Sequence, residues 1–530
     1  MLKFLTRKED RPHARKFATL NRPLLFISLA LLTTAGATFA VASRSGRNII
    51  SVVERRLAAS GAPLSGHAEP SAAQQKEAAQ KDGPLVGANF RISQISSVGQ
   101  ERDASSPDTA YNPDDNEYLV VWMGNGLAQS LGVAEIFGRR IKAATGESVG
   151  ADFRISNMSD GGKGRSGYAP KVVYNPTSHE YLVVWHGQAA PDSPDSVLEI
   201  HGQRLSRTGD EVGKDFRIST TTDLGKIMGS FVRASAHADL AWNSTDNQYL
   251  VVWDAMGQPE ELIRTEIYGQ LLDASGTSLG KNFRISNTND QGAEFNANAP
   301  AVAYNSTNNQ YLVVWSGPFK QKSQNEVWAQ AVSASGAQVG KGTGDFTISQ
   351  VSTNIGADRD ASAPKVAYNS SSNEYLVVFQ ANAVAGVDNA QANEVFGQRI
   401  NAATLAETGS NDFRISNTPG SFMNRADNPR VAFNAKSLEY MVVWRGVRTD
   451  VPFEIFGQRL SLEGSEIEAD FQVSSVASIG KDRTVNMAAI APNSASGEYL
   501  AVWHGDGLIG PNAKGVNEIF GQRIKPAARR

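Results

Sequence analysis

The chain has no cysteine among its 530 residues. That absence excludes disulfide bonds, thiol catalysis and cysteine-ligated metals. An excess of charge of one sign is also lacking, because 51 Lys and Arg stand against 54 Asp and Glu, and we therefore expect no nucleic-acid partner. The sequence contains no nucleotide-binding loop, zinc-ligand spacing or nucleophile elbow. No catalytic residue, cofactor or metal site is therefore predicted from a motif.

What the sequence does contain is one unit repeated seven times. Each unit carries a Tyr-Leu-Val-Val-Trp-like block, followed by a Glu-Ile-Phe-Gly-Gln-Arg-like block and a Phe-Arg-Ile-Ser-like block. A period of about 60 residues predicts one supersecondary module copied along the chain. The tyrosines that begin the first block are Tyr118, Tyr181, Tyr249, Tyr311, Tyr375, Tyr440 and Tyr499.

The blocks within a unit predict four strands. The Tyr-Leu-Val-Val-Trp block is a continuous run of β-branched and aromatic residues, which is typical of a strand buried on both faces. In the fifth unit, residues 364–369 predict a strand before this block, and residues 394–400 predict a strand after it. A fourth strand ends at residues 413–416. Four antiparallel strands in seven units predict an all-β protein, a seven-bladed β-propeller over residues 83–530.

The two ends of the repeat are offset from one another. The first Phe-Arg-Ile-Ser block, residues 90–93, stands before the first Tyr-Leu-Val-Val-Trp block, and the last unit stops at residue 524 after its third strand. Residues 85–93 are therefore predicted to supply the fourth strand of the last blade, which removes open sheet edges. A right-handed β-helix is the alternative solenoid, but its rungs are shorter than this repeat and need no offset.

Over residues 83–524 the repeat resembles those of β-propellers in bacterial exported and surface proteins. The resemblance is one of architecture, and it implies a fold without naming a ligand. The period is longer than that of WD40 repeats, a Trp-Asp pair occurs only at Trp253-Asp254, and the glycine doublets of kelch repeats are missing.

Residues 1–82 predict an export or membrane segment and a linker. Residues 1–22 are rich in Lys and Arg, and residues 23–42 then carry no charge over a length sufficient to span a bilayer. This bias predicts a cytoplasmic N-terminus and an external propeller. A retained signal anchor and a signal peptide cleaved near residues 40–42 are both open. Residues 43–82 predict a flexible linker. We expect an exported protein, anchored facing outward, or secreted or periplasmic if the signal is cleaved.

The sequence places a binding face at the long connections between second and third strands and at the crossings between blades. An arginine recurs just before the first strand in six units, and six cations around a channel mouth could bind an anion or a carboxylated glycan. The alternative that we favour is structural, with each arginine paired to its unit's recurring glutamate or to a nearby aspartate. These arginines are Arg102, Arg165, Arg233, Arg359, Arg425 and Arg483.

Residues that break the repeat are the other candidates. His186 and His504 both follow the conserved tryptophan of a second strand, and we interpret them, like His237 and the Glu260-Glu261 pair, mainly as surface loop residues. Asp160, Asp223 and Asp290 recur after the fourth strand, where loop capping explains them better than calcium binding does.

Taken together, the sequence favours a non-catalytic, extracytoplasmic binding scaffold with a protein or glycan partner at the cell envelope. The alternative is a carbohydrate-active hydrolase or lyase with its site on the same face. Such an enzyme would need acid and base groups that break the repeat and lie close together.

Overall fold

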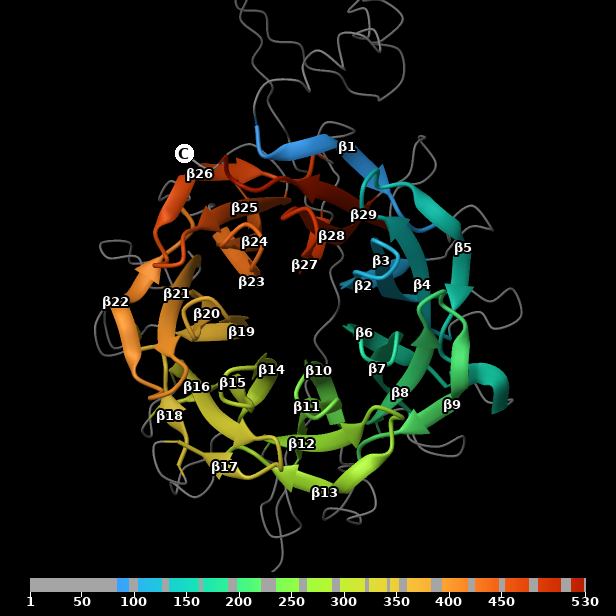
Figure 1. Ribbon diagram of the computed structural model, residues 1–530, viewed down its shortest axis with the longest axis horizontal. Coiled ribbons are helices and arrows are strands. Elements are labelled where there is room, and N and C mark those ends of the chain that lie inside the picture. Colours follow the sequence, from blue (N-terminus) through green and yellow to red (C-terminus); the bar gives the residue numbers. More distant parts are fainter. Residues whose placement is uncertain are drawn as a thin grey trace, which may run out of the picture. The chain divides into compact units, whose positions relative to one another are not determined.

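Seven four-stranded antiparallel sheets follow one another around a ring within the described part of the chain (Figure 1). The computed structural model describes residues 83–94, 103–125, 133–161, 165–188, 198–220, 235–256, 265–287, 296–319, 324–340, 344–351, 360–382, 393–417, 425–447, 453–475, 485–506 and 516–528. All of them belong to one compact unit, Lys76–Arg530. The predicted all-β, seven-bladed propeller is confirmed.

The first strand of each blade lies nearest the ring centre, and the second strand packs outside it (Figure 1). The first strands are β2 (Ala104–Asn112), β6 (Gly167–Asn175), β10 (Ser235–Asn243), β14 (Asn298–Asn305), β19 (Ala361–Asn369), β23 (Arg425–Asn434) and β27 (Val485–Pro492). The second strands are β3 (Glu117–Gly124), β7 (Glu180–Gln188), β11 (Gln248–Met256), β15 (Gln310–Pro318), β20 (Glu374–Ala381), β24 (Glu439–Val447) and β28 (Tyr499–Asp506).

The third and fourth strands complete each blade on the outside. The third strands are β4 (Glu135–Lys142), β8 (Leu198–Ser206), β12 (Thr265–Asp273), β16 (Asn325–Ser333), β21 (Glu394–Asn401), β25 (Glu454–Leu460) and β29 (Asn517–Ile524). The fourth strands are β5 (Ser148–Arg154), β9 (Glu211–Arg217), β13 (Ser278–Arg284), β22 (Glu407–Arg414), β26 (Glu466–Gln472) and β1 (Leu85–Arg91). In blade 4 two short strands, β17 (Gln338–Val339) and β18 (Phe346–Thr347), take this place. A 3₁₀ turn covers Met158–Gly161.

The ring is closed by its N-terminal strand. β1 pairs antiparallel with β29, with Leu85 opposite Ile524 and Arg91 opposite Phe520. The last sheet therefore has the order β1-β29-β28-β27. This confirms the closure predicted from the offset of the repeat.

Each second strand is buried on both faces because it belongs to two hydrophobic interfaces. Tyr118, Val120 and Trp122 of β3 pack against blade 7, whereas Leu119 and Val121 pack against blade 2. Alternate residues of a strand point to opposite faces, so one continuous apolar run serves both neighbours. The ring is thus held together by a hydrophobic seam between each pair of adjacent blades.

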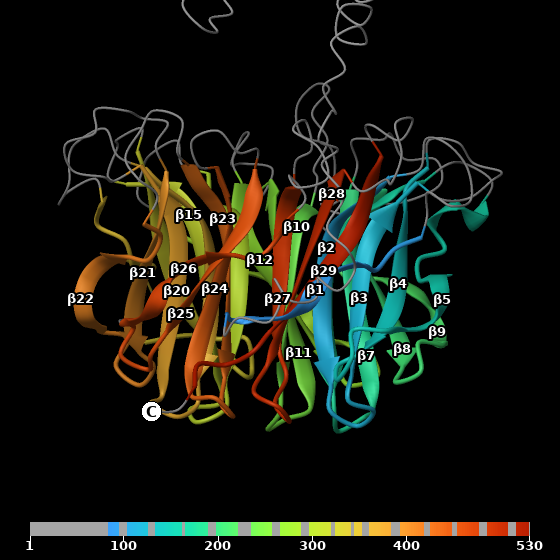
Figure 2. The same ribbon diagram turned by 90° about the horizontal axis from the view of Figure 1, so that it is seen from above.

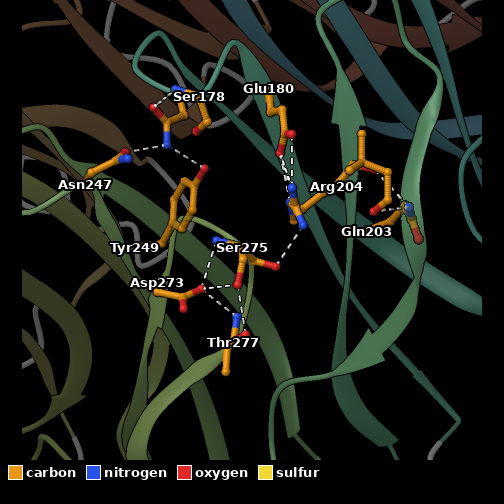
Figure 3. Close-up of polar contacts among 11 residues, drawn as sticks. Ser178, Glu180, Gln203, Arg204, Asn247, Tyr249, Asp273, Ser275 and Thr277 are labelled. Carbon is orange, nitrogen blue, oxygen red and sulfur yellow. Dashed lines mark hydrogen bonds and ion pairs between the residues drawn. The ribbon is translucent and has the colours of Figure 1, made fainter.

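Polar contacts also join adjacent blades, as Figure 3 shows at blades 2 and 3. Arg204 forms a two-pronged ion pair with Glu180 in its own blade, at 2.8 and 3.0 Å. Its remaining nitrogen donates to the carbonyl oxygen of Ser275 in the next blade, at 3.0 Å. Arg140 and Arg399 repeat this arrangement. The charged residues of the repeat therefore serve, at these positions, to fasten blade to blade.

The recurring glutamates are likewise structural. All are buried, and each accepts a hydrogen bond from the serine that ends the fourth strand of its blade. Glu135, Glu394 and Glu518 in addition face the arginine of the same Phe-Arg-Ile-Ser block. The glutamates are Glu135, Glu199, Glu266, Glu326, Glu394, Glu454 and Glu518.

The predicted membrane segment, residues 23–42, and the linker at residues 43–82 lie outside the described residues. Within the part that the structure covers, no helix is long and apolar enough to cross a membrane.

Candidate active site at the mouth of the channel

The first strand of every blade has a β-bulge at the same position, close to the end of the ring where this strand begins and the second strand ends. Its register shifts there, and one non-glycine residue adopts a φ of 44° to 53°. Bulges re-aim side chains and are frequent beside active sites. The residues at this bulge position are Ser106, Ala169, His237, Ala299, Ala363, Asn428 and Met487. Figure 2 shows the strands running between the two ends of the ring.

A belt of hydrogen bonds joins the bulges of adjacent blades. In four blades, the side chain after the conserved aromatic residue of the second strand accepts from the bulge N–H of the next blade. Asp254 accepts from Ala299 (2.9 Å), Ser316 from Ala363 (3.1 Å) and Gln380 from Asn428 (2.8 Å). His504 accepts from Ser106 at 3.4 Å. This position therefore has a structural function in most blades.

At the junction of blades 2 and 3 the belt is interrupted, and a cluster of acid and base groups lies there. His186 occupies the acceptor position, yet its Nδ1 is buried without a hydrogen-bond partner. Its ring stacks on Tyr168 at 5.6 Å and lies 6.4 Å from the ring of His237. His237 Nδ1 lies 2.8 Å from Asp254 Oδ2. Histidine is one of the residues that tolerate the left-handed conformation at the bulge.

The surroundings of the two histidines push their pKa values in opposite directions. The hydrogen bond that His237 donates to Asp254, together with the negative charge of that carboxylate, raises the pKa of His237 above 6.5. Burial and the neighbouring His237 lower the pKa of His186 to about 4, so His186 is neutral near pH 7. Paired titratable groups whose environments separate their pKa values are typical of acid–base sites.

The geometry gives His237 the properties of a general base. The Asp254 carboxylate accepts a hydrogen bond from the Nδ1–H of His237. The Nε2 atom of the neutral imidazole then carries the lone pair that can take a proton. The side chain of His237 is 64% exposed, whereas that of Asp254 is 7% exposed, so the base faces solvent and the group that orients it does not. Tyr168, stacked on His186, adds a hydroxyl that can donate or accept a proton nearby.

Deeper in the channel lies a ring of positions, two residues after each bulge, where charges break the repeat. Asp108 pairs with Lys171 of the next blade at 3.6 Å and accepts from the Val172 N–H at 3.0 Å. Asp239 accepts from the Val302 N–H at 3.2 Å. Electrostatic interactions link these groups to Lys365 and Arg430 across the channel. Burial raises the pKa of Asp108 despite Lys171. Its side chain keeps 18% exposure, as does that of Lys171.

Of the six recurring arginines, the structure describes Arg165 and Arg425. Arg425 pairs with the neighbouring aspartate Asp427 at 2.5 Å, and Asp427 also holds Arg445 through two bonds of 2.7 Å. Arg165 has a buried Nε without a hydrogen-bond partner and lies within electrostatic reach of His201. Arg102, Arg233, Arg359 and Arg483 lie outside the described residues, so the arginine ring remains a prediction.

The two histidines predicted as loop residues lie in strands instead, His186 in β7 and His504 in β28. Their rings do not meet in a common site, because His186 lies beside His237, whereas His504 contacts the bulge of blade 1. Burial, and then Arg445, lower the pKa of His504 to about 4. Glu260, Glu261, Asp223 and Asp290 lie outside the described residues. Among those described, no group of three His, Asp or Glu is placed to hold a metal ion.

Sequence reasoning missed Tyr168, Asp254 and the channel charges. A signal was available, because aligning the seven first strands shows a position that changes among Asp, Lys, Arg and Ala, whereas the residue before it is always Pro or Ala and the residue after it is aliphatic in six of the seven. Repeat-breaking residues at one register position converge in a closed ring. The corresponding residues are Asp108, Lys171, Asp239, Ala301, Lys365, Arg430 and Ala489.

Comparisons with known proteins gave structural matches alone. No protein-family model and no curated protein matches the chain. An α-L-arabinanase from Penicillium chrysogenum is 10% identical, with 72% of this chain and 100% of that chain covered and a TM-score of 0.43. An α-L-arabinofuranosidase from Fusarium graminearum is 12% identical, with 84% and 98% covered and a TM-score of 0.41. A polysaccharide lyase is 9% identical, with 79% and 90% covered and a TM-score of 0.47.

The function favoured by the sequence, a non-catalytic binding scaffold, is corrected. An enzyme was expected to need acid and base groups that break the repeat and lie close together, and such a cluster is present at blades 2 and 3. The matched structures are described as glycoside hydrolases, a polysaccharide lyase and a deacetylase. The likeness itself is one of fold and assigns no role to any residue.

Proposed function

We propose that the protein is a carbohydrate-active enzyme that cleaves a glycan at the mouth of its channel. The observation that carries the proposal is the pairing of His237 with the buried Asp254, beside Tyr168 and the neutral His186. Cleaving a glycosidic bond requires one group to take a proton and another to give one. His237 is the base in this proposal, and the Tyr168 hydroxyl is the proton donor.

The scaffold supports these roles by holding each group on a strand rather than on a loop. Tyr168 and His186 are cross-strand partners in β6 and β7. Asp254 is fixed twice, by His237 and by the Ala299 N–H of the next blade. Catalytic groups on rigid elements keep a productive geometry more closely than groups on loops do.

The natural location proposed for this enzyme is outside the cytoplasmic membrane. The support is the uncharged run at residues 23–42 behind a basic leader. A glycan partner at the cell envelope fits such a location. Protease added to intact spheroplasts should digest the propeller, and protection from the protease would contradict the orientation.

A polysaccharide screen with product analysis tests the activity. Wild-type protein and the Tyr168→Phe variant are incubated with neutral and acidic polysaccharides, and products are analysed by mass spectrometry. Shortened chains from at least one polysaccharide, formed at least tenfold more slowly by Tyr168→Phe, would support the proposal. Binding to a glycan without any product would contradict it. A product with a carbon–carbon double bond indicates a lyase, and addition of water indicates a hydrolase.

A further inference from the structure

The charges at the channel position are distributed unevenly around the ring. Blades 1, 2 and 3 place Asp108, Lys171 and Asp239 there, so each carboxylate has a cation beside it in the order of the blades. Blades 5 and 6 place Lys365 and Arg430 side by side. Blades 4 and 7, which flank this second pair, carry alanine at the same position, Ala301 and Ala489. Blades 1 to 3 therefore carry two carboxylates and one cation at this position, whereas blades 5 and 6 hold two adjacent cations between alanines.

The two carboxylates do not neutralise those two adjacent cations directly. Asp108 bonds to Lys171 and to the Val172 N–H in blade 2. Asp239 accepts from the Val302 N–H in blade 4 and from its own neighbour, Leu240 N–H, at 3.1 Å. Their charges reach Lys365 and Arg430 through space only.

Lys365 and Arg430 have no carboxylate partner among the described residues. The Nη1 of Arg430 donates to the carbonyl oxygen of the adjacent Pro429 at 2.9 Å, and its Nε is buried without any partner. Burial, followed by the charge of Arg430, lowers the pKa of Lys365 to about 7. Two partly buried cations on adjacent blades, without a carboxylate partner, repel one another unless an anion lies beside both. The arrangement thus has the chemistry of an oxoanion site, in which Arg430 supplies directed N–H donors and Lys365 a point charge.

We propose that Lys365 and Arg430 bind the carboxylate of an acidic sugar, so that the substrate is a uronate-containing glycan. This inference rests on the proposed function, because it places the sugar carboxylate in the same channel as the base. The base and the cationic pair lie on first strands around one ring centre, and His237 stands two residues before the channel position of its own blade. Inorganic oxoanions share the recognition chemistry, and the experiment separates them from a sugar.

A uronate substrate would also favour β-elimination over hydrolysis. Neutralising a uronate carboxylate makes the hydrogen on the adjacent C5 carbon more acidic, because charge that develops there spreads onto the carboxylate. Nε2 of His237 takes that proton, and the C5–H electron pair forms the C4–C5 double bond. The C4–O bond breaks, and the leaving oxygen takes a proton from the Tyr168 hydroxyl. The proton held by His237 then passes through solvent to the Tyr168 oxygen, which restores both groups. The step is a β-elimination, and it consumes no water, oxidant or cofactor.

The alanines found in two blades indicate which substitutions can test the anion site. Alanine occupies the channel position in blades 4 and 7, so Lys365→Ala and Arg430→Ala introduce a residue that the ring already accepts there. Lys281→Ala, at an exposed position of the outer strand β13, is the matched control for loss of a lysine. Thermal unfolding of every variant checks that the ring stays folded, and removal of an unpaired cation is expected not to lower the midpoint.

The measurement is calorimetric titration of the full chain with D-glucuronate, D-glucose and inorganic phosphate at constant ionic strength. We expect glucuronate to bind the wild type and Lys281→Ala equally, and to bind Lys365→Ala and Arg430→Ala at least tenfold more weakly. Equal glucuronate affinity in all four proteins would overturn the proposal. Phosphate binding without glucuronate binding would also overturn it, because the site would then serve a free oxoanion.

Comparing glucuronate binding with glycan turnover in these variants tests the anion site and the enzymatic activity independently. His237→Ala should keep its affinity for glucuronate while losing turnover of a uronate polymer. Glucuronate binding that depends on Lys365 and Arg430, without turnover of any glycan by the wild type, would overturn the enzyme and leave the anion site standing. Turnover confined to neutral glycans would overturn the acidic substrate and leave the enzyme standing.

Discussion

His237 Nδ1 and Asp254 Oδ2 lie 2.8 Å apart, and the same carboxylate oxygen accepts the Ala299 N–H of the next blade at 2.9 Å. Asp254 is thus a member of the structural belt that joins adjacent bulges, and it also orients the one imidazole that occupies a bulge position. The fold did not require a new element for this site. A histidine at one bulge was sufficient to turn a blade-to-blade contact into a support for a base.

Changing Asp254 to Asn tests how this carboxylate acts. One carboxylate oxygen meets both His237 Nδ1 and the Ala299 N–H, so an amide oxygen in its place keeps both hydrogen bonds, and only the negative charge is lost. Without that charge, the imidazolium that forms when His237 takes a proton is less stabilised. We expect Asp254→Asn to reduce kcat by at least about tenfold, with an unfolding midpoint close to that of the wild type.

The interaction between Asp254 and His237 also predicts how kcat depends on pH. Asp254 raises the pKa of His237, and the base must be neutral, so wild-type kcat should rise as the pH passes through this raised pKa. Any residual activity of Asp254→Asn should rise at a lower pH. The pair stabilises the fold fully below the unfolded pKa of histidine, and this contribution is lost as the pH rises through the raised folded pKa. A kcat profile that falls across the same range would identify His237 as an acid instead.

The contacts in Figure 3 predict that Arg204 contributes more to stability than a surface arginine does. Arg204→Gln removes the two-pronged bond to Glu180 and the bond to the Ser275 carbonyl of the next blade. Because Arg204 and Glu180 are 21% and 17% exposed, we expect the free energy of unfolding to fall by about 1–3 kcal/mol in urea denaturation. Lys142→Gln, which breaks an exposed pair with Glu147, should cost about 0–1 kcal/mol. Equal losses in the two variants would refute the role of Arg204 as a fastener between blades.

Closure of the ring predicts a large effect of the N-terminal strand. Deleting residues 83–93 removes β1 from the edge of β29 and exposes the apolar seam that Ile92 helps to fill. We expect aggregation or a broad, non-cooperative thermal transition. Removing residues 528–530 instead, beyond the last strand and beyond the Ala527 N–H that donates to Glu439, is the control. A protein without residues 83–93 that melts as sharply as the full chain would contradict the closure.

The fold was predictable because its causes are local and repeated. The Tyr-Leu-Val-Val-Trp block marks a strand that packs on both faces, and Tyr118 to Trp122 divide between two blade interfaces as that pattern requires. The offset of residues 90–93 against residue 524 likewise determined how the ring closes.

The site was not predictable in the same way, because it depends on residues from different blades. His237 and Asp254 share one hairpin, but Tyr168 and His186 come from the preceding blade, and the two pairs meet only because the ring places these blades side by side. An alignment of the repeats detects residues that the blades share, such as the recurring arginines. It does not show which residues unique to single blades lie close together. His237 was dismissed as a loop residue, because nothing in its local sequence shows the left-handed bulge that aims its side chain.

The most direct test of the account compares two histidine variants on the polysaccharide that the wild type cleaves. Alanine already occupies the bulge of blades 2, 4 and 5, at Ala169, Ala299 and Ala363, so His237→Ala should fold normally. His179, 61% exposed in a turn at the opposite end of its strand, is the matched control. We predict that kcat/KM falls by at least about 10²-fold for His237→Ala and stays within twofold for His179→Ala. Full activity of His237→Ala would contradict the proposed active site.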